Sequence, residues 1–297
     1  MKTYFRSISC PNCGKSNDIK RSECTHCKGD LGNPDAKPFR HHLIFPIWKE
    51  ALFFALAVVG LSVIATIVQS IQLAQAATVL GPSATREELL ASIMDPSKLV
   101  FVEFAAYGTI FTAIALLIWS GWKSVGKSFA GWKPYVFGLA GFGTIIVFEL
   151  VYGQIMNVVA AALGVTPGSN NNQNTLVALI GYAPALCLLF FGILGPFVEE
   201  FAYRVGLFGL GSRLGKPLGY IFTILVFALI HFDYQAAFDF VNQRPQAILE
   251  WLNLPVYMFS GAAFCFLYDK VGFGASYFAH MLNNVFSISM NIIGAGQ

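Results

Sequence analysis

Residues 50–73 read EALFFALAVVGLSVIATIVQSIQL, an apolar run with a single charge, on Glu50. At about 1.5 Å per residue, a helix of this length spans the roughly 30 Å hydrocarbon core of a bilayer. Six more apolar runs follow, so the sequence predicts an all-α polytopic membrane protein. The seven predicted spans are residues 50–73, 99–121, 135–163, 176–195, 217–233, 251–268 and 273–293.

The overall composition supports a lipid-facing surface. The chain has 297 residues, of which 56% are hydrophobic and only 12% are charged. Soluble domains average about 25% charged residues, so a water-facing surface is excluded. The net charge of +3 is too small to indicate nucleic-acid binding. The N-terminus lacks the apolar core of a cleavable signal peptide, and we therefore expect the first apolar run to act as an uncleaved anchor.

The fourth run continues into an amphipathic segment, residues 196–212. Residues 176–212 would form a helix of about 55 Å, too long for one crossing. Gly195-Pro196 is the expected break or kink, which gives seven to eight transmembrane helices. The uncharged stretch 164–175 contains Asn170-Asn171-Asn172-Gln173-Asn174 and is predicted to be a flexible external loop.

Loop charges predict the orientation. The N-terminal segment and the connections at 122–134 and 212–217 are rich in Lys and Arg, whereas the connections at 74–98 and 233–250 carry more acidic residues. Lys and Arg accumulate on the cytosolic side of membrane proteins. We therefore expect a multi-pass protein of the cell membrane with a cytosolic N-terminus.

The N-terminal segment predicts a metal-binding module. Cys10, Cys13, Cys24 and Cys27 form two CxxC pairs separated by ten residues. Zn²⁺ prefers four thiolates in a tetrahedron, and each CxxC turn supplies two. Disulfides or unbound thiols are the alternative, but disulfides are disfavoured in the cytosol. His26 between the last two cysteines is expected to be a surface residue.

The predicted organisation follows from this pattern. Residues 1–34 resemble the short zinc ribbons at the ends of many bacterial membrane proteins, residues 35–49 form a linker, and residues 50–297 form the membrane domain. A ribbon of this size is expected to have a structural role or to dock a cytosolic or membrane protein partner. Cys187 and Cys265 lie in apolar runs and are expected to be small buried residues.

Ionisable residues inside apolar runs mark candidate functional positions, because each one is costly in a membrane. Residues 195–204 read GPFVEEFAYR and contain the first group. On a helix, Glu200 and Arg204 are spaced to pair at i, i+4, while Glu199 points about 100° away. The other members are Phe227 with His231, and His280 with Asn284, each pair again at i, i+4.

These three segments resemble the EExxxR, FxxxH and HxxxN/D motifs of the CPBP intramembrane proteases, a family named for CAAX proteases and bacteriocin-processing enzymes. The resemblance covers residues 135–293 and excludes the ribbon. It implies an intramembrane endopeptidase that cleaves a membrane-associated peptide or protein. It does not by itself imply a prenylated substrate.

The resemblance also implies roles for the six residues. Glu199 would activate water with the help of His231, His280 and Asn284 would stabilise the oxyanion, and Glu200 with Arg204 would form a supporting pair. In the alternative arrangement, Glu199, His231 and His280 hold a catalytic Zn²⁺ with an open position for water. The sequence leaves both mechanisms open.

Other interpretations have less support from the residues. The polar groups can be structural, with the protein acting as a non-catalytic membrane scaffold or a bacteriocin-immunity-type protein that binds a partner. A transporter is a weaker alternative, because no internal repeat is present. Glu103 and Glu149 match no motif, and we expect them at the membrane interface or in pairing roles. Asp233 is expected at the membrane edge.

Overall fold

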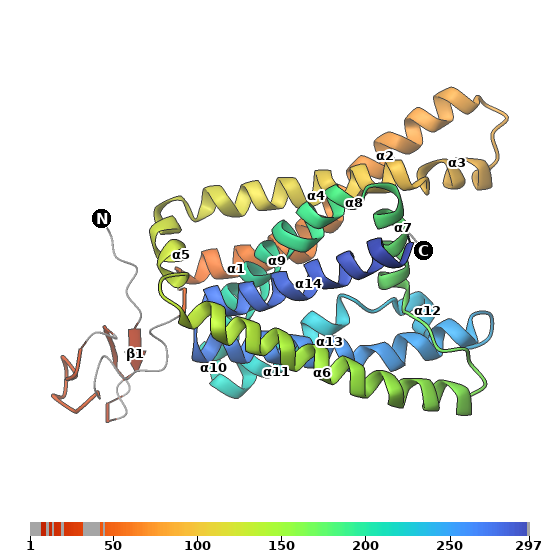
Figure 1. Ribbon diagram of the computed structural model, residues 1–297. Coiled ribbons are helices and arrows are strands. Elements are labelled where there is room, and N and C mark those ends of the chain that lie inside the picture. Colours follow the sequence, from red (N-terminus) through yellow and green to blue (C-terminus); the bar gives the residue numbers. More distant parts are fainter. Residues whose placement is uncertain are drawn as a thin grey trace.

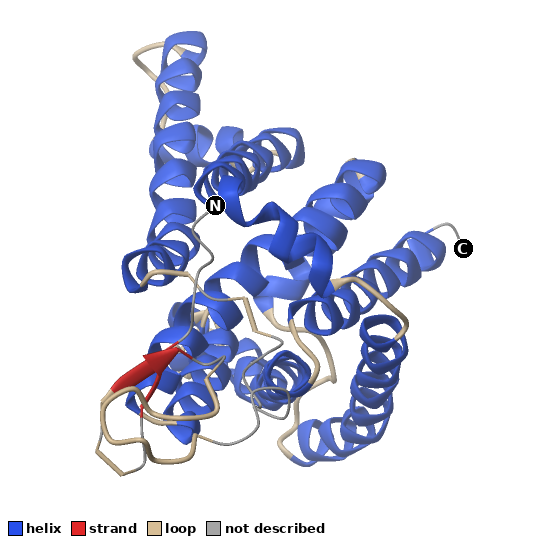
Figure 2. Ribbon diagram, turned by 90° about the vertical axis from the view of Figure 1, so that its left-hand side faces the viewer, coloured by secondary structure: helices blue, strands red, loops and turns tan. Residues whose placement is uncertain are grey.

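A computed structural model of the protein describes residues 7–9, 12–13, 15–18, 21–31, 42–43 and 45–295. In these residues the fold is a bundle of helices preceded by one small hairpin, β1 (Ser7–Ser9) paired antiparallel to β2 (Ser16–Asp18). Figure 1 shows the C-terminal helix α14 (Phe273–Ala295) running through the middle of the bundle, and Figure 2 shows the hairpin at one end of the molecule. The predicted all-α membrane class is confirmed.

The first half of the bundle consists of long helices with short connections. Its elements are α1 (Ile47–Ala55), η2 (Leu56–Gly60), α2 (Leu61–Leu80), α3 (Arg86–Ile93), α4 (Pro96–Leu117), η3 (Trp119–Gly121), α5 (Trp122–Ser128) and α6 (Lys133–Ala162). The run from α1 to α2 has 34 residues and a length of about 51 Å. This exceeds the bilayer core, and the end of α2 projects with α3 from the bundle (Figure 1).

The second half carries the motifs. Its elements are α7 (Asn171–Tyr182), α8 (Pro184–Cys187), η4 (Leu188–Leu194), α9 (Gly195–Glu199), η5 (Glu200–Phe208), α10 (Gly209–Leu214), α11 (Lys216–Leu229), α12 (Tyr234–Phe238), α13 (Arg244–Lys270) and α14 (Phe273–Ala295). The segments η2, η4 and η5 are π-helical, a conformation that is frequent at functional sites.

Five helices are long and apolar enough to cross a membrane, among the residues that the structure describes. They are Ile47–Leu80, Pro96–Leu117, Lys133–Ala162, Pro184–Leu214 and Arg244–Lys270. The predicted span at 217–233 is the 14-residue helix α11, about 21 Å long and too short to cross alone. Helix α14 has 23 residues, but His280 and several asparagines lower its hydropathy. Seven to eight crossings therefore stay a prediction.

Of the predicted break or kink at Gly195-Pro196, the break is wrong. The backbone is helical from Pro184 to Leu214. Pro196 lies in the first turn of α9, where the π-helix η4 ends, and a proline is tolerated in a first turn because the N–H that it lacks is not needed there for a helix hydrogen bond. The chain breaks instead at Ala183, where φ is −139° and ψ is 65°.

The predicted flexible loop at Asn170–Asn174 is also corrected. Asn170 is buried and caps α7, with its Oδ1 accepting from the backbone N–H of Gln173 at 3.1 Å. Asn residues are favoured at helix N-caps, so the tract starts a helix. In contrast, Cys187 and Cys265 are fully buried as predicted.

The core of the bundle is aromatic and surrounds η5. Phe53, Phe201 and Phe273 are completely buried, and ring contacts link them at 5.0–5.3 Å. Helix α1 lies directly on η5, because a Cβ at Gly206 would stand 2.8 Å from the backbone oxygen of Glu50. The absence of a side chain at Gly206 therefore allows the backbones of α1 and η5 to approach each other closely.

The end of the predicted linker packs on the membrane domain. His42 stacks on Tyr268 with ring centroids 4.6 Å apart, and its Nε2 lies 3.1 Å from the backbone oxygen of Asp269. Phe45 meets Phe53 edge to face at 5.2 Å. The chain is therefore fixed before α1 begins.

Candidate active site

Four elements, α9, η5, α11 and α14, bring the motif residues together. Glu199 and Glu200 stand at the junction of α9 and η5, with Arg204 one turn further along η5. His231 follows the end of α11, and His280 and Asn284 lie on α14. Contacts of α14 with α9, η4 and η5 place these segments side by side.

Glu200 is the centre of a buried polar network. Its Oε1 lies 3.0 Å from His280 Nδ1 and 3.4 Å from Arg204 Nε, and the two side chains of the pair Glu200–Arg204 are fully buried. The Ser276 hydroxyl contacts Glu200 Oε2 and also lies 2.8 Å from the backbone oxygen of Phe264. Each charge of the network therefore has a counter-charge, as burial requires.

The guanidinium of Arg204 is enclosed by aromatic rings. Its Cζ lies 4.7 Å from the ring centre of Phe227, 5.4 Å from that of Phe264 and 5.9 Å from that of Tyr203. Cation–π attraction offsets part of the cost of burying the charge. Phe227 of the FxxxH motif therefore contacts Arg204 of the EExxxR motif.

Glu199 faces the other side of His280. Its Oε2 is 3.7 Å from His280 Nε2, and this oxygen is buried without a hydrogen-bond partner in the described residues. The two glutamates therefore approach one imidazole from different sides, Glu200 at Nδ1 and Glu199 at Nε2.

His231 is held by backbone and ring contacts. Its Nδ1 lies 2.7 Å from the backbone oxygen of Phe227, and its ring stacks on Tyr257 with centroids 4.5 Å apart. The backbone oxygen of His231 accepts from Asn170 Nδ2 at 2.9 Å. Nδ1 of His231 contacts a backbone oxygen and Nδ1 of His280 contacts Glu200. Nε2 is therefore the ring nitrogen through which each histidine can take part in a reaction.

Asn284 is oriented by η4. Its Nδ2 donates to the backbone oxygen of Phe191 at 2.9 Å. An amide nitrogen carries two hydrogens, so one N–H of Asn284 remains for another acceptor.

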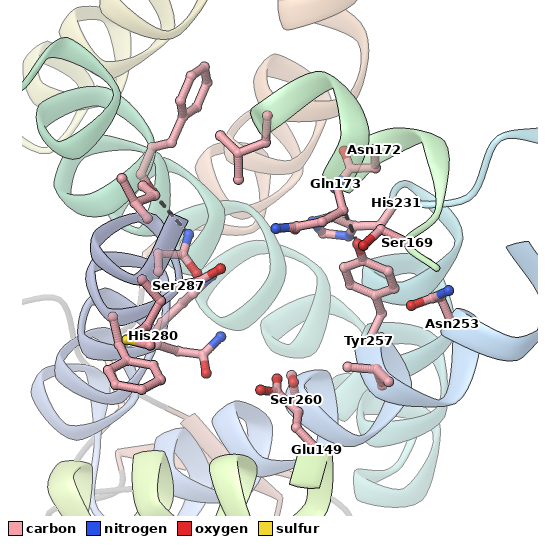
Figure 3. A pocket seen from close by; sticks show the side chains of 18 of the residues that line it. Glu149, Ser169, Asn172, Gln173, His231, Asn253, Tyr257, Ser260, His280 and Ser287 are labelled. Carbon is pink, nitrogen blue, oxygen red and sulfur yellow. Dashed lines mark hydrogen bonds between the residues drawn. The ribbon is translucent and has the colours of Figure 1, made fainter. Parts of the chain in front are cut away.

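A cavity of about 440 Å³ lies between α6, α7, α13 and α14. His231, His280 and Asn284 line it, and Figure 3 shows the two histidines on opposite sides of this space. Glu199, Glu200 and Arg204 do not line the cavity but lie behind His280. The rest of the wall is rich in neutral polar side chains: Ser169, Asn172, Gln173, Asn253, Ser260, Asn283, Ser287 and Asn291.

The sequence analysis did not identify several residues of the polar network and the cavity wall. Ser276 stands four residues before His280, and this helical spacing could have indicated it. Asn283 is adjacent to Asn284 and also lines the cavity. Tyr257 and Asn170 had no sequence signal, because they reach His231 only through the packing of α13 and α7.

The ribbon cysteines form a separate cluster. Ligand atoms of Cys13, Cys24 and Cys27 all lie within 4.8 Å of one another, and the Sγ atoms of Cys13 and Cys24 are 3.7 Å apart. Two thiolates on a tetrahedral Zn²⁺ are separated by about 3.8 Å, given Zn–S bonds of about 2.3 Å. Asn17 Nδ2 and the backbone N–H of His26 point at Cys24 Sγ, as donors around a thiolate do. Cys10 lies outside the described residues.

The motif residues do not form such a cluster. Among the described residues, the cysteine group is the one set of three or more His, Cys, Asp or Glu ligand atoms found within 4.8 Å of one another. Glu199, His231 and His280 do not form a second group of this kind among the described residues, and a catalytic Zn²⁺ on them stays a prediction.

Comparison with known proteins is consistent with this site. Residues 181–286 match the family model described as "Type II CAAX prenyl endopeptidase Rce1-like". The matched segment contains all six motif residues from Glu199 to Asn284, and the family is one of proteases, in agreement with the predicted enzyme class. No curated protein and no solved structure matches the chain.

Proposed function

We propose that the protein cleaves a membrane-associated peptide or protein within the bilayer, with Glu199 as the general base. The observation that carries this proposal is the buried Glu199 Oε2, which has no hydrogen-bond partner in the described residues and lies 3.7 Å from a histidine of the cavity wall. A buried polar atom without a partner is costly, and a water molecule is the smallest group that satisfies it.

The reaction follows from this placement. The water held by Glu199 attacks the scissile carbonyl carbon and gives its proton to the carboxylate. The same proton then passes to the leaving amine as the C–N bond breaks, which releases a carboxylic acid and an amine. In this proposal the water lies between Glu199 and the cavity, and His231 of the cavity wall helps to hold it.

His280 and Asn284 are the proposed oxyanion donors. In this proposal Nδ1 of His280 is held by Glu200, its Nε2 side faces the reaction, and Asn284 supplies its second N–H to the oxyanion. Glu200 and Arg204 act as positioning residues, because both side chains are fully buried and Glu200 fixes the ring of His280.

The ribbon is proposed to hold a structural Zn²⁺ on Cys13, Cys24 and Cys27 with Cys10 as the fourth ligand. In this proposal the N-terminus is cytosolic and the ribbon docks a protein partner. The separation of its cysteines supports zinc, while the membrane domain uses no metal in the reaction above.

A cleavage assay in proteoliposomes tests the catalytic proposal. The substrate is a library of synthetic transmembrane peptides, and products are identified by mass spectrometry. Glu199→Gln and His231→Ala should abolish cleavage while both variants keep wild-type amounts in membranes. The matched control is Glu87→Gln, which removes an exposed carboxylate of α3 and should cleave normally.

Wild-type cleavage by Glu199→Gln would overturn the glutamate mechanism. The scaffold alternative would gain support if motif variants kept the cellular phenotype while Cys13→Ser lost it.

A further inference from the structure

Glu149 gives the cavity a charge that the reaction does not use. This residue of α6 is half-buried and lines the same cavity as His231 and His280. Figure 3 shows it beside Ser260, rising from α6 toward the space below Tyr257. It is the one Asp, Glu, Lys or Arg among the lining residues.

The position of Glu149 on the wall is fixed by its neighbours on α6. Phe148 stacks on Phe259 with ring centroids 3.9 Å apart, and the hydroxyl of Tyr152 donates to the backbone oxygen of Leu252 at 2.9 Å. Both contacts fasten α6 to α13 on either side of Glu149. The carboxylate therefore has a defined place in the cavity wall.

The carboxylate of Glu149 lacks a partner within the chain. Across residues 45–295 no hydrogen bond or ion pair reaches it, whereas Glu200, Glu250 and Asp269 are each paired. Glu103 of α4 also has none there, but it does not line the cavity. A carboxylate near the middle of a membrane helix is costly unless paired, so a cation from outside the chain would stabilise it.

We propose that Glu149 is a specificity-determining residue that pairs with a Lys or Arg side chain of the substrate, close to the bond that is cleaved. The inference rests on the proposed function, because it takes the cavity as the substrate site. One cavity of about 440 Å³ holds both Glu149 and the catalytic histidines, so the basic residue lies within a few positions of the scissile bond. Among the described residues, the wall contains no other Asp or Glu, so no second carboxylate competes with Glu149 for the basic residue of the substrate.

The test compares peptides that differ at one residue. Synthetic transmembrane peptides with Lys, Gln or Glu at each position around the cleaved bond are incubated in proteoliposomes with wild type, Glu149→Gln, Glu149→Lys and the control Glu87→Gln. Wild type and the control should cleave the Lys peptide on the order of tenfold faster than the Gln peptide at one position, as expected for a partly desolvated ion pair. Glu149→Gln should lose this preference but still cleave the Gln peptide, and Glu149→Lys should favour the Glu peptide.

Cleavage by wild type without a charge preference, or an unchanged preference in Glu149→Gln, would overturn the inference and leave the proposed function intact. Should wild type cleave none of the peptides, the proposed function fails. Binding of the same labelled peptides to Glu199→Gln and to Glu149→Gln/Glu199→Gln then decides the inference separately. Tighter binding of the Lys peptide only when Glu149 is present supports it, and equal binding contradicts it.

Discussion

His280 is hydrogen-bonded through Nδ1 to Oε1 of Glu200 at 3.0 Å, in a place where both side chains are buried. The pairing joins the first motif of the chain to the third, 80 residues apart. It fixes the plane of the imidazole and aims Nε2 toward Glu199.

Removal of the Glu200 charge should destabilise the whole bundle. Glu200→Gln leaves Arg204 buried without a counter-charge, and loss of one partner of a buried ion pair costs about 3–5 kcal/mol. Thermal unfolding in detergent should show a lower Tm and loss of cleavage. The double variant Glu200→Gln/Arg204→Met should regain part of the stability but not the activity. A single variant as stable as wild type would contradict the role of the pair.

The stack between His231 and Tyr257 should affect cleavage more than the hydroxyl of Tyr257 does. Tyr257→Phe keeps the ring at 4.5 Å and loses only the hydrogen bonds with Asn170 and Asn172. Tyr257→Leu removes the ring, at a cost of about 0.5–1.5 kcal/mol for the stacked pair. We expect a larger drop in kcat for Leu than for Phe. Equal rates for the two variants would show that the stack does not position His231.

Stability should depend on Asp233 in acid. The side chain of Asn171 and the backbone N–H groups of Ala236 and Gln235 hold the pKa of Asp233 below its usual range. A carboxyl group with a lowered folded-state pKa stabilises the fold above about pH 4, and this stabilisation is lost as the pH falls through the folded-state pKa. Unfolding in detergent from pH 6 to pH 3 should therefore show a smaller acid loss for Asp233→Asn than for wild type. Parallel curves would rule out this contribution.

Zinc content should depend on the ribbon alone. Elemental analysis of purified protein should find about one Zn²⁺ per chain in the wild type, and almost none in Cys24→Ser, since Cys24 is the buried thiol of the cluster. The control Cys187→Ser alters a buried cysteine outside the ribbon and should keep its zinc. Stoichiometric zinc in Cys24→Ser would instead place a metal in the membrane domain.

A methyl group at Gly206 should separate α1 from η5. The added Cβ would stand 2.8 Å from the backbone oxygen of Glu50, and such overpacking costs about 1–3 kcal/mol. Gly143→Ala on α6 is the matched control, because its Cβ would meet nothing within 4 Å. In that exposed helix position alanine should be neutral or slightly stabilising. Equal Tm values for both variants would contradict the close packing of the two helices.

The sequence by itself determined the class of the protein and the pairing of Glu200 with Arg204. Length and hydropathy decide whether a segment is a membrane helix, and i, i+4 spacing decides which residues share a face. These are local properties, so the pairing of Glu200 with Arg204 and the burial of Cys187 and Cys265 followed from them. The four-cysteine pattern likewise indicated the cluster of Cys13, Cys24 and Cys27.

Only the tertiary structure decided which faces meet. The convergence of Glu199 and Glu200 on His280, and the capping of α7 by Asn170, depend on contacts between helices distant in sequence. The chain breaks at Ala183 because the residue before a proline, here Pro184, disfavours the helical conformation, whereas the helix continues through Pro196 in α9. Glu149 matched no motif, and it gained a candidate role because α6, α13 and α14 together enclose the cavity that it lines.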